Sequence, residues 1–351
     1  MVAYSERPFD MPAPQRAIAR KSYKKDIPEN LRVQLLALER KDNWHNLFSI
    51  SYDWLVIIAA IVITLKLGMN PLVYILAVIV VGSRQRALMN LLHEASHSKL
   101  FKNRPVNDWI GRFFTCYPMG ASFSAYQNAH FIHHGLLWDE EKDPKTIRYK
   151  TLGLITPPAD QLTFFRRHIV RPLLLAHVAY NIAAALSLKG ERRLETLVRF
   201  GFLALVLVGV IVAHILPSFF FFWIVPFCTS FQIIRYWNEM AEHAGLPDYN
   251  AWMATRSWRS TFLMEWLLAP HSDDLYHLAH HLFPLIPHYR LATAHRLLMQ
   301  LPQYASAHHC DGFFFPRRAD APSVLQDIRR PQDIDKYHRS LQNALPNNHF
   351  Q

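Results

Sequence analysis

Histidine is the residue type whose number and spacing in this sequence point most directly to chemistry. Twenty of the 351 residues are histidines, and eight of them fall in three short segments, 93–97, 130–134 and 277–281. Side chains three or four residues apart lie on the same face of a helix, so each segment is expected to present its imidazole rings in one direction. The eight are His93, His97, His130, His133, His134, His277, His280 and His281.

Clustered histidines of this kind indicate a metal site. Neutral imidazole is the commonest nitrogen ligand for iron and zinc, and eight converging rings exceed what one metal accepts, so we predict two metals. A ninth candidate is His243, which ends the segment that begins at Arg235. A thiolate site and a disulfide framework are not expected, because Cys116, Cys228 and Cys310 are odd in number and widely spaced.

The elements that must position these rings are long apolar runs. A spanning helix needs about 20 largely apolar residues, which the first two runs reach only with their flanks, the second continuing toward Leu92. The last two runs contain no Asp, Glu, Lys or Arg, and Pro217 separates them. The four runs are 54–65, 72–81, 200–216 and 218–234.

These runs predict an all-α integral membrane protein whose four transmembrane helices form two hairpins, with a helical cytosolic cap that holds the histidine-rich metal site. Basic residues near span ends stay on the cytoplasmic side. They are frequent before the first run and absent from both hairpin turns. Both termini and the histidines are therefore expected to be cytoplasmic. We expect a single domain over 1–351, with a cytosolic arm over 1–45 and a cytosolic tail over 303–351.

The net charge of the chain limits the classes of partner that we expect it to bind. A formal net charge of +11 suits a surface of anionic lipid or an acidic protein partner. A nucleic-acid partner is not expected, because the basic residues gather beside the apolar runs and form no groove interleaved with aromatic residues. A cleavable signal peptide is not expected either, because the first fifty residues are polar and rich in proline and charge.

The order of the histidine motifs resembles that of the membrane fatty acid desaturase superfamily, which also contains fatty acid, sphingolipid and carotenoid hydroxylases. One His-x-x-x-His segment is followed by two His-x-x-His-His segments, and the likeness is strongest over 92–144 and 235–291. The resemblance implies a cytosolic di-iron centre that activates dioxygen as co-substrate. It also implies that the nine histidines are the ligands of the two iron ions.

The function that this resemblance implies is the dioxygen-dependent desaturation of a fatty acyl or other lipid-like substrate, free or carrier-bound. Hydroxylation of a lipid, sphingoid or carotenoid-like substrate is the alternative, because the same first hydrogen abstraction leads to an alkene or an alcohol. The electrons are expected from a separate ferredoxin or cytochrome-type protein with its reductase. The chain itself has no Gly-x-Gly-x-x-Gly turn and no cysteine set for an iron–sulfur cluster.

Four further residues are candidates for additional ligands or for groups that orient the ligands. Where related desaturases have an asparagine near the centre, this chain has Glu239 four residues before His243. This departure leaves the ninth and tenth coordination positions open. The candidates are Glu94, Asn238, Glu239 and Glu242.

Two alternatives of other classes are compatible with parts of the pattern. The segment His93-Glu94-Ala95-Ser96-His97 also matches the signature of zinc metalloproteases, in which the glutamate acts as general base. That interpretation leaves the two later histidine segments without a role. A metal transporter is the other alternative, but transport sites lie near the bilayer midplane, whereas these segments follow the ends of the predicted spans.

Overall fold

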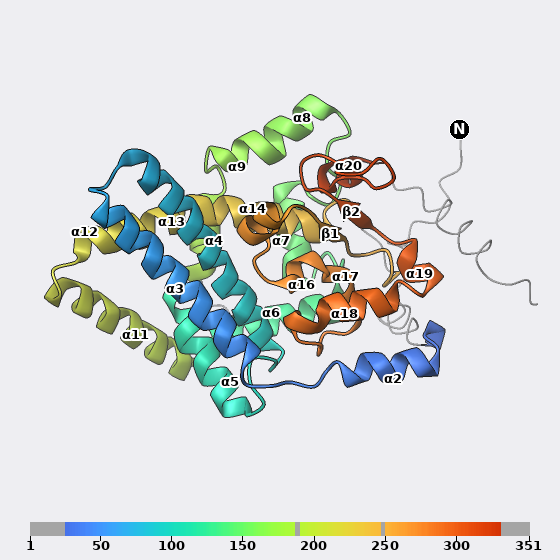
Figure 1. Cartoon of the computed structure of the whole chain (residues 1–351), viewed down its shortest axis with the longest axis horizontal. Coiled ribbons are helices and arrows are strands. Elements are labelled where there is room, and N and C mark those ends of the chain that lie inside the picture. The colour runs from blue at the N-terminus through green and yellow to red at the C-terminus, as the bar shows by residue number, and fades with distance from the viewer. Residues whose placement is uncertain (1–24, 187–189, 247–249, 331–351) are drawn as a thin grey trace, which may run out of the picture.

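The computed structural model describes residues 25–186, 190–246 and 250–330, and this part of the chain is mostly helical (Figure 1). The predicted arm over 1–45 is described only from Lys25 onward. Within the described part of the arm, the longest complete helix is α2 (Glu29–Ala37), which buries Leu31 and Leu35. Residues 331–351 of the predicted tail also lie outside the described part.

Four helices are long and apolar enough to cross a membrane, which confirms the four predicted runs. Each extends beyond its run, because the flanking residues continue the helix. Their surfaces are apolar outside the bundle: Leu72 and Leu205 are each 73% exposed. The four are α3 (His45–Lys66), α4 (Pro71–Ser96), α11 (Arg193–Val212) and the run Leu216–His243. The last run comprises α12 (Leu216–Phe219), a π-helical segment η6 (Phe220–Ile224), α13 (Val225–Cys228) and α14 (Ser230–His243).

The ends of these helices follow from local chemistry. Asn70 caps α4 by accepting a hydrogen bond from the backbone N–H of Leu72 at 3.0 Å, and Pro71 occupies the first turn, where no donor is needed. Pro217 was predicted to separate the last two runs. It lies instead in the first turn of α12, and the helix before it ends at Val212, because proline is tolerated at a helix start.

Helices α4 and α14 cross closely at Gly82, and this crossing matters because both helices end in histidines. A Cβ atom at Gly82 would lie 2.6 Å from the backbone nitrogen of Phe231 and would collide with Ser230 Oγ. Ser230 Oγ donates a hydrogen bond to the carbonyl oxygen of Val78 at 2.5 Å, which ties the two helices together. Glycine at position 82 therefore fixes the spacing between the helix that carries His93 and the helix that carries His243.

Shorter helices connect α4 to α11. The N-terminus of α6 is capped twice, because Ser122 accepts from the backbone N–H of Ala125 and Glu195 of α11 accepts from the backbone N–H of Phe123 at 2.5 Å. The elements are α5 (Arg104–Ile110), η3 (Gly111–Cys116), η4 (Tyr117–Met119), α6 (Phe123–Leu136), α7 (Pro144–Leu152), α8 (Gln161–Phe165), η5 (Arg166–Val170), α9 (Arg171–Leu173) and α10 (Val178–Leu186).

The chain after α14 packs against the C-terminal end of that helix and includes two short strands that the all-α prediction missed. β1 (Ser257–Arg259) pairs in parallel with β2 (His309–Asp311), with Trp258 opposite Cys310. Three-residue strands are too short to show a period in the sequence. The helices are α15 (Phe262–Leu268), α16 (Ser272–Leu275), α17 (His277–Leu282), α18 (His288–Leu298), α19 (Pro302–Ala305) and α20 (Val324–Arg329).

The largest cluster of buried apolar side chains lies in this region and includes Trp258, Tyr304, Cys310 and Ile328. The segment predicted as a tail from residue 303 is therefore part of the folded core as far as α20. Arg256 adds a buried ion pair to Asp327 at 2.7 Å and donates to the carbonyl oxygen of Ala241, close to the end of α14. This packing holds α17 against the ends of α4, α6 and α14.

Candidate metal centre

The nine predicted histidines lie together, in two neighbouring groups. In the first group, one ring nitrogen from each of five histidines lies within 4.8 Å of every other. They come from the end of α4, from α6 and from α17. These five are His93, His97, His130, His134 and His280.

The second group is built from α6, α14 and α17. Ring nitrogens of His133, His243 and His281 lie within 4.8 Å of one another, and His243 forms a further set with His277 and Glu242. The sequence predicted that each segment points its rings in one direction, but His133 and His134 belong to different groups, and so do His280 and His281. Successive helix residues are about 100° apart around the axis, so adjacent rings diverge.

The contacts inside the groups have the separation of ligands on a shared metal. Two nitrogens bound at right angles to one metal at about 2.1 Å would lie about 3 Å apart. Four pairs of Nε2 atoms approach one another at this separation. They are His97 and His130 at 2.8 Å, His134 and His280 at 3.0 Å, His133 and His243 at 3.2 Å, and His243 and His277 at 3.2 Å.

The rings are suited to bind metal because burial keeps them unprotonated. Burial lowers the pKa of His277 to about 3, and lowers the pKa of His97, His130, His134 and His280 well below the usual value, with further lowering from neighbouring positive groups. His281 behaves in the same way. Buried nitrogens without any hydrogen-bond partner include His93 Nε2 and His281 Nε2. Orphaned buried nitrogens are costly unless a metal accepts their lone pairs, so the donor set fits a pair of metals.

Hydrogen bonds at the other ring nitrogen fix the orientation of several rings. His93 Nδ1 lies 2.6 Å from Asp273 Oδ2, and His133 Nδ1 lies 3.1 Å from Asp143 Oδ2. His243 Nδ1 lies 2.9 Å from the carbonyl oxygen of Ala254. In each case the acceptor holds the proton on Nδ1 and leaves the lone pair of Nε2 directed into the group.

Asp143 has two roles, because it is also the N-cap of α7. Its Oδ1 accepts from the backbone N–H of Lys145 at 2.9 Å, while Thr146 Oγ1 donates to its Oδ2 at 2.7 Å. Burial raises the pKa of Asp143, but the interaction with His133 and these hydrogen bonds outweigh it and bring the pKa to about 2. The carboxylate therefore stays charged beside His133.

Of the four further candidates, Glu94 groups with His93 and Asp273, and Glu242 groups with His243 and His277. Glu242 Oε2 is 3.7 Å from His277 Nε2, and Lys145 Nζ forms an ion pair with the same oxygen. Glu239 pairs with arginines instead, and Asn238 donates to the carbonyl oxygen of Leu268. Neither lies in a group of possible metal ligands among the described residues.

Glu94 lies beside His93 but is held by other partners. Its Oε1 is 2.5 Å from Lys99 Nζ in a fully buried ion pair, and its Oε2 accepts from the backbone N–H of His288 at 3.0 Å. These contacts connect the end of α4 to the start of α18. Glu94 therefore holds the end of α4 against the start of α18.

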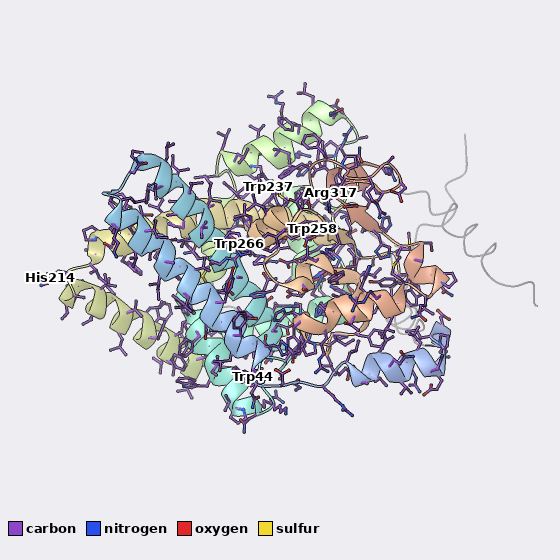
Figure 2. The ribbon with its side chains drawn as sticks, viewed as in Figure 1. Trp44, His214, Trp237, Trp258, Trp266 and Arg317 are labelled. Atoms are coloured by element: carbon purple, nitrogen blue, oxygen red, sulfur yellow. The ribbon has the colours of Figure 1, made fainter. Side chains whose placement is uncertain are left out.

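Three histidines other than the nine candidates show surroundings without a metal site. His214 is exposed at the far end of the molecule (Figure 2). His271 pairs with Asp53 at 2.9 Å, and His308 with Asp327 at 3.1 Å. None of these three joins a group of possible ligands in the described ranges.

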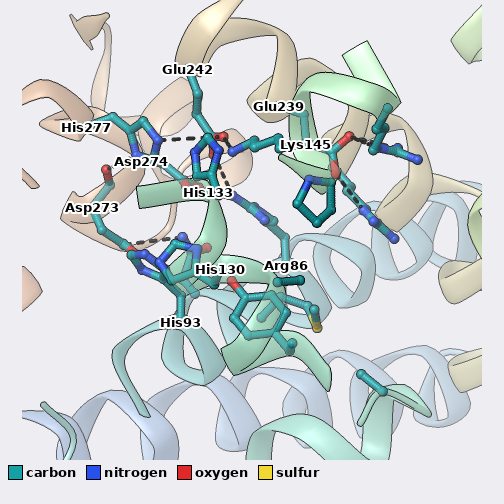
Figure 3. Close-up of a pocket in the computed structure, with 18 of the residues that line it drawn as sticks. Arg86, His93, His130, His133, Lys145, Glu239, Glu242, Asp273, Asp274 and His277 are labelled. Carbon is teal, nitrogen blue, oxygen red and sulfur yellow. Dashed lines mark hydrogen bonds and ion pairs between the residues drawn. The ribbon is translucent and has the colours of Figure 1, made fainter. Parts of the chain in front are cut away.

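A pocket of about 390 Å³ adjoins both histidine groups (Figure 3). His93, His130, His133 and His277 form one wall. The remaining walls carry charged side chains, most of which pair with residues far away in the sequence. These are Arg86, Lys145, Arg148, Arg235 and Asp274.

Arg86 is central to these charges. It contacts Asp274 at 2.6 Å and Glu242 at 3.4 Å (Figure 3). Burial raises the pKa of Asp274; Arg86 opposes this, whereas the neighbouring Asp273 and Glu242 carboxylates reinforce it, and the pKa is about 7. The one sign of these ion pairs in the sequence was that Arg86 falls within a predicted apolar helix, where a charged residue needs a partner.

Comparison with known proteins places this geometry in a family. The family model described as fatty acid desaturase matches residues 69–312, which include all nine histidines. The chain is also 31% identical over 325 residues to a dihydrorhizobitoxine desaturase from Bradyrhizobium elkanii, covering 88% of this chain and 91% of that protein. The chain therefore belongs to the fatty acid desaturase family and is an oxidoreductase of the desaturase and hydroxylase type.

Proposed function

We propose that the protein is a membrane enzyme that holds two iron ions and uses dioxygen to desaturate a bound substrate. The observation that carries the proposal is the pair of neighbouring histidine groups, which are largely buried and adjoin one pocket. Nine histidines in this arrangement exceed the needs of a single zinc ion, which argues against the metalloprotease alternative.

The two groups have separate roles in this proposal. His93, His97, His130, His134 and His280 hold one iron, and His133, His243, His277 and His281 hold the other, with Glu242 available beside it. Bound irons supply, by reaction with dioxygen, the oxidising power that no side chain provides. The chain's own residues set the positions: Asp273 and Asp143 orient His93 and His133, and the pocket holds the substrate against the rings.

Desaturation fixes the balance of atoms and electrons. A CH₂–CH₂ unit loses two protons and two electrons, and dioxygen takes these together with two further electrons and two further protons to give two water molecules. The further electrons must come from a donor. We propose a separate ferredoxin or cytochrome-type protein, because the sequence has no nucleotide-binding turn or cysteine cluster.

Electrostatic docking of such a donor would use exposed basic residues. Arg192 and Arg193 are exposed and offer positive charge. Arg317 and Arg318 both contact Asp311, at 3.2 and 3.3 Å, so part of their charge is neutralised. The basic residues Arg16, Arg20, Lys21 and Lys24 lie outside the described part of the chain.

We further propose that the four apolar helices cross the membrane as two hairpins, with the histidine groups on the cytoplasmic side. The turns near Asn70 and His214 would then face outward, and the ends of α4 and α14 would face the cytoplasm. Single cysteines introduced near Gln127 and near Met69, in a variant without native cysteines, test this by labelling in intact cells. Labelling near Gln127 by an impermeant reagent would contradict it.

The reaction itself is tested by product mass. The full-length protein, reconstituted with donor, reductase and dioxygen, should yield product two hydrogens lighter than substrate, and should consume dioxygen only when reductant is present. A product one oxygen heavier would identify the hydroxylase alternative. Metal movement without dioxygen uptake would support the transporter instead. The relative is named for acting on dihydrorhizobitoxine.

A further inference from the structure

The pocket beside the histidine groups is lined by an unusual number of charges. Of its 20 lining residues, eight carry a formal charge. Sites for small molecules are mostly apolar, with a few polar groups that fix orientation. The apolar side chains that line this pocket are short or slender, apart from one aromatic ring. The charged residues are Arg86, Lys145, Arg148, Arg235, Glu239, Glu242, Asp273 and Asp274.

These charges are not evenly distributed. On one side Glu239 pairs with two cations: Arg148 Nη2 lies 2.7 Å from its Oε2, and Arg235 Nε lies 2.9 Å from its Oε1. Two guanidinium groups share one carboxylate, which leaves a surplus of one positive charge. The compensating Asp273 lies on the histidine side, where it accepts hydrogen bonds from His93 and Asn90. Figure 3 shows Glu239 and Asp273 at opposite sides of the pocket.

The surplus guanidinium groups also have donors to spare. Arg148 Nη1 is buried and has no hydrogen-bond partner. Arg235 makes its one described side-chain hydrogen bond through Nε, so its terminal nitrogens have no partner in the described ranges. Fork-shaped guanidinium donors match the two oxygens of a carboxylate, and the charge strengthens such hydrogen bonds.

The remaining cations cannot take this role. Arg86 is occupied by Asp274 and Glu242, and Lys145 is paired with Glu242. Glu239 is one helical turn before His243 on α14, which corresponds to about 6 Å along the axis. An anionic group held by Arg148 and Arg235 therefore lies close to the second histidine group, and little length separates the anchor from the reacting carbon.

A long acyl chain does not suit this chamber. Burial of apolar surface contributes about 25 cal/mol per Å² only when the chain replaces water with apolar contacts. In this pocket a long acyl chain would instead displace water from the charged side chains without replacing the hydrogen bonds that the water makes, which costs free energy. The apolar side chains of the lining, Met89, Ala121, Ala125, Ala129 and Pro144, are short or slender and fit a few methylene groups.

We infer that the substrate is a compact carboxylate-bearing molecule, anchored by Arg148 and Arg235, with a short aliphatic segment presented to the histidine groups. This inference rests on the proposed desaturase function, but binding can be measured without turnover. It narrows the lipid-like substrate that the family resemblance implied to a small polar acid.

The test is calorimetric binding to the full-length protein as purified in detergent, with four probes: hexanoate, norleucine, hexylamine and palmitoyl-coenzyme A. Hexanoate and norleucine should bind, because each carries a carboxylate on a short chain. Hexylamine should not bind, because it lacks the anion, and palmitoyl-coenzyme A should not compete with hexanoate.

Variants identify the anchor. Arg148→Gln and Arg235→Gln should each weaken hexanoate binding at least tenfold, whereas Arg104→Gln, at an exposed site outside the pocket, should leave it unchanged. Arg148→Lys keeps the charge and should fall between. Unchanged metal content and an unchanged circular dichroism spectrum show that a variant has folded. If Arg148→Gln does not fold, hexanoate binding by Arg148→Lys and Arg235→Gln tests the anchor.

Three outcomes would overturn the inference: hexanoate and norleucine both fail to bind, the glutamine variants bind hexanoate as tightly as the native protein, or palmitoyl-coenzyme A displaces hexanoate. Desaturation of palmitoyl-coenzyme A with no binding of the small acids would refute the substrate class and leave the desaturase function standing. Binding of hexanoate without reductant-dependent dioxygen uptake in the reconstituted enzyme would refute the function instead.

Discussion

The two histidine groups are built differently, although they share helices. The first has five imidazoles and lies between α4, α6 and α17, whereas the second has four imidazoles with Glu242 beside them and lies between α6, α14 and α17. α4 serves only the first group and α14 only the second. α6 and α17 serve both, because each has adjacent histidines that diverge. The doubled histidine is thus the device by which one helix supplies two neighbouring sites.

Replacing one member of an adjacent pair should separate the two groups most clearly. We expect His134→Ala to lose the metal of the first group and His133→Ala that of the second, so each variant retains about half of the native iron. Activity should fall at least about 100-fold in both, since even residues that only support ligands affect activity by about 10–100-fold. Elemental analysis and turnover measure this. His214→Ala is the control, and retention of full iron by either variant would contradict the assignment.

The carboxylates that orient the rings should show the same division with a smaller effect. Asp273→Asn should weaken the metal of the first group, through His93, and Asp143→Asn that of the second, through His133. We expect a loss of about 10–100-fold in metal affinity, measured by competition with a chelator. Asp320→Asn is the control, because the Asp320 side chain is 74% exposed. Equal loss from both groups in either variant would show that these carboxylates act on the fold as a whole.

The spacing between the groups depends on the crossing of α4 and α14. Gly82→Ala places a methyl group against the backbone of Phe231, so we expect a loss of about 1–3 kcal/mol in stability, as for overpacked cores. Gly201→Ala is the matched control, because a Cβ there has no neighbour within 4 Å, and it should change stability by no more than about 1 kcal/mol. Thermal unfolding in detergent compares them. Equal melting temperatures would mean that the crossing adapts.

Buried histidines outside the groups should have the smallest effect, on the pH dependence of stability. Burial lowers the pKa of His168 and His295 to about 4, against 6.5 without burial. Between these values the unfolded chain binds more protons, so stability falls as pH drops from 6.5 to about 4 and then levels off. His295→Gln should flatten the melting temperature across this range, whereas His214→Gln should not. An unchanged slope in His295→Gln would contradict the shifted pKa.

The sequence was sufficient for the parts of the site that are local. Histidines three or four residues apart were predicted from their spacing, His243 from its place after the last apolar run, and the four long helices from the length of their apolar runs. The division of His133 from His134 required the orientation of α6 relative to both groups. The charged pocket was missed because its ion pairs are remote: Arg86 and Asp274 are 188 residues apart, and Arg148 and Glu239 are 91 apart.

The central claim is that each histidine group holds one iron, and the metal content of the native protein tests it most directly. Full-length protein from cells grown with both iron and zinc should contain about two irons per chain by elemental analysis. A content of one zinc per chain, unchanged when His280 or His281 is replaced by alanine, would contradict the account and would favour a hydrolytic site at the segment from His93 to His97.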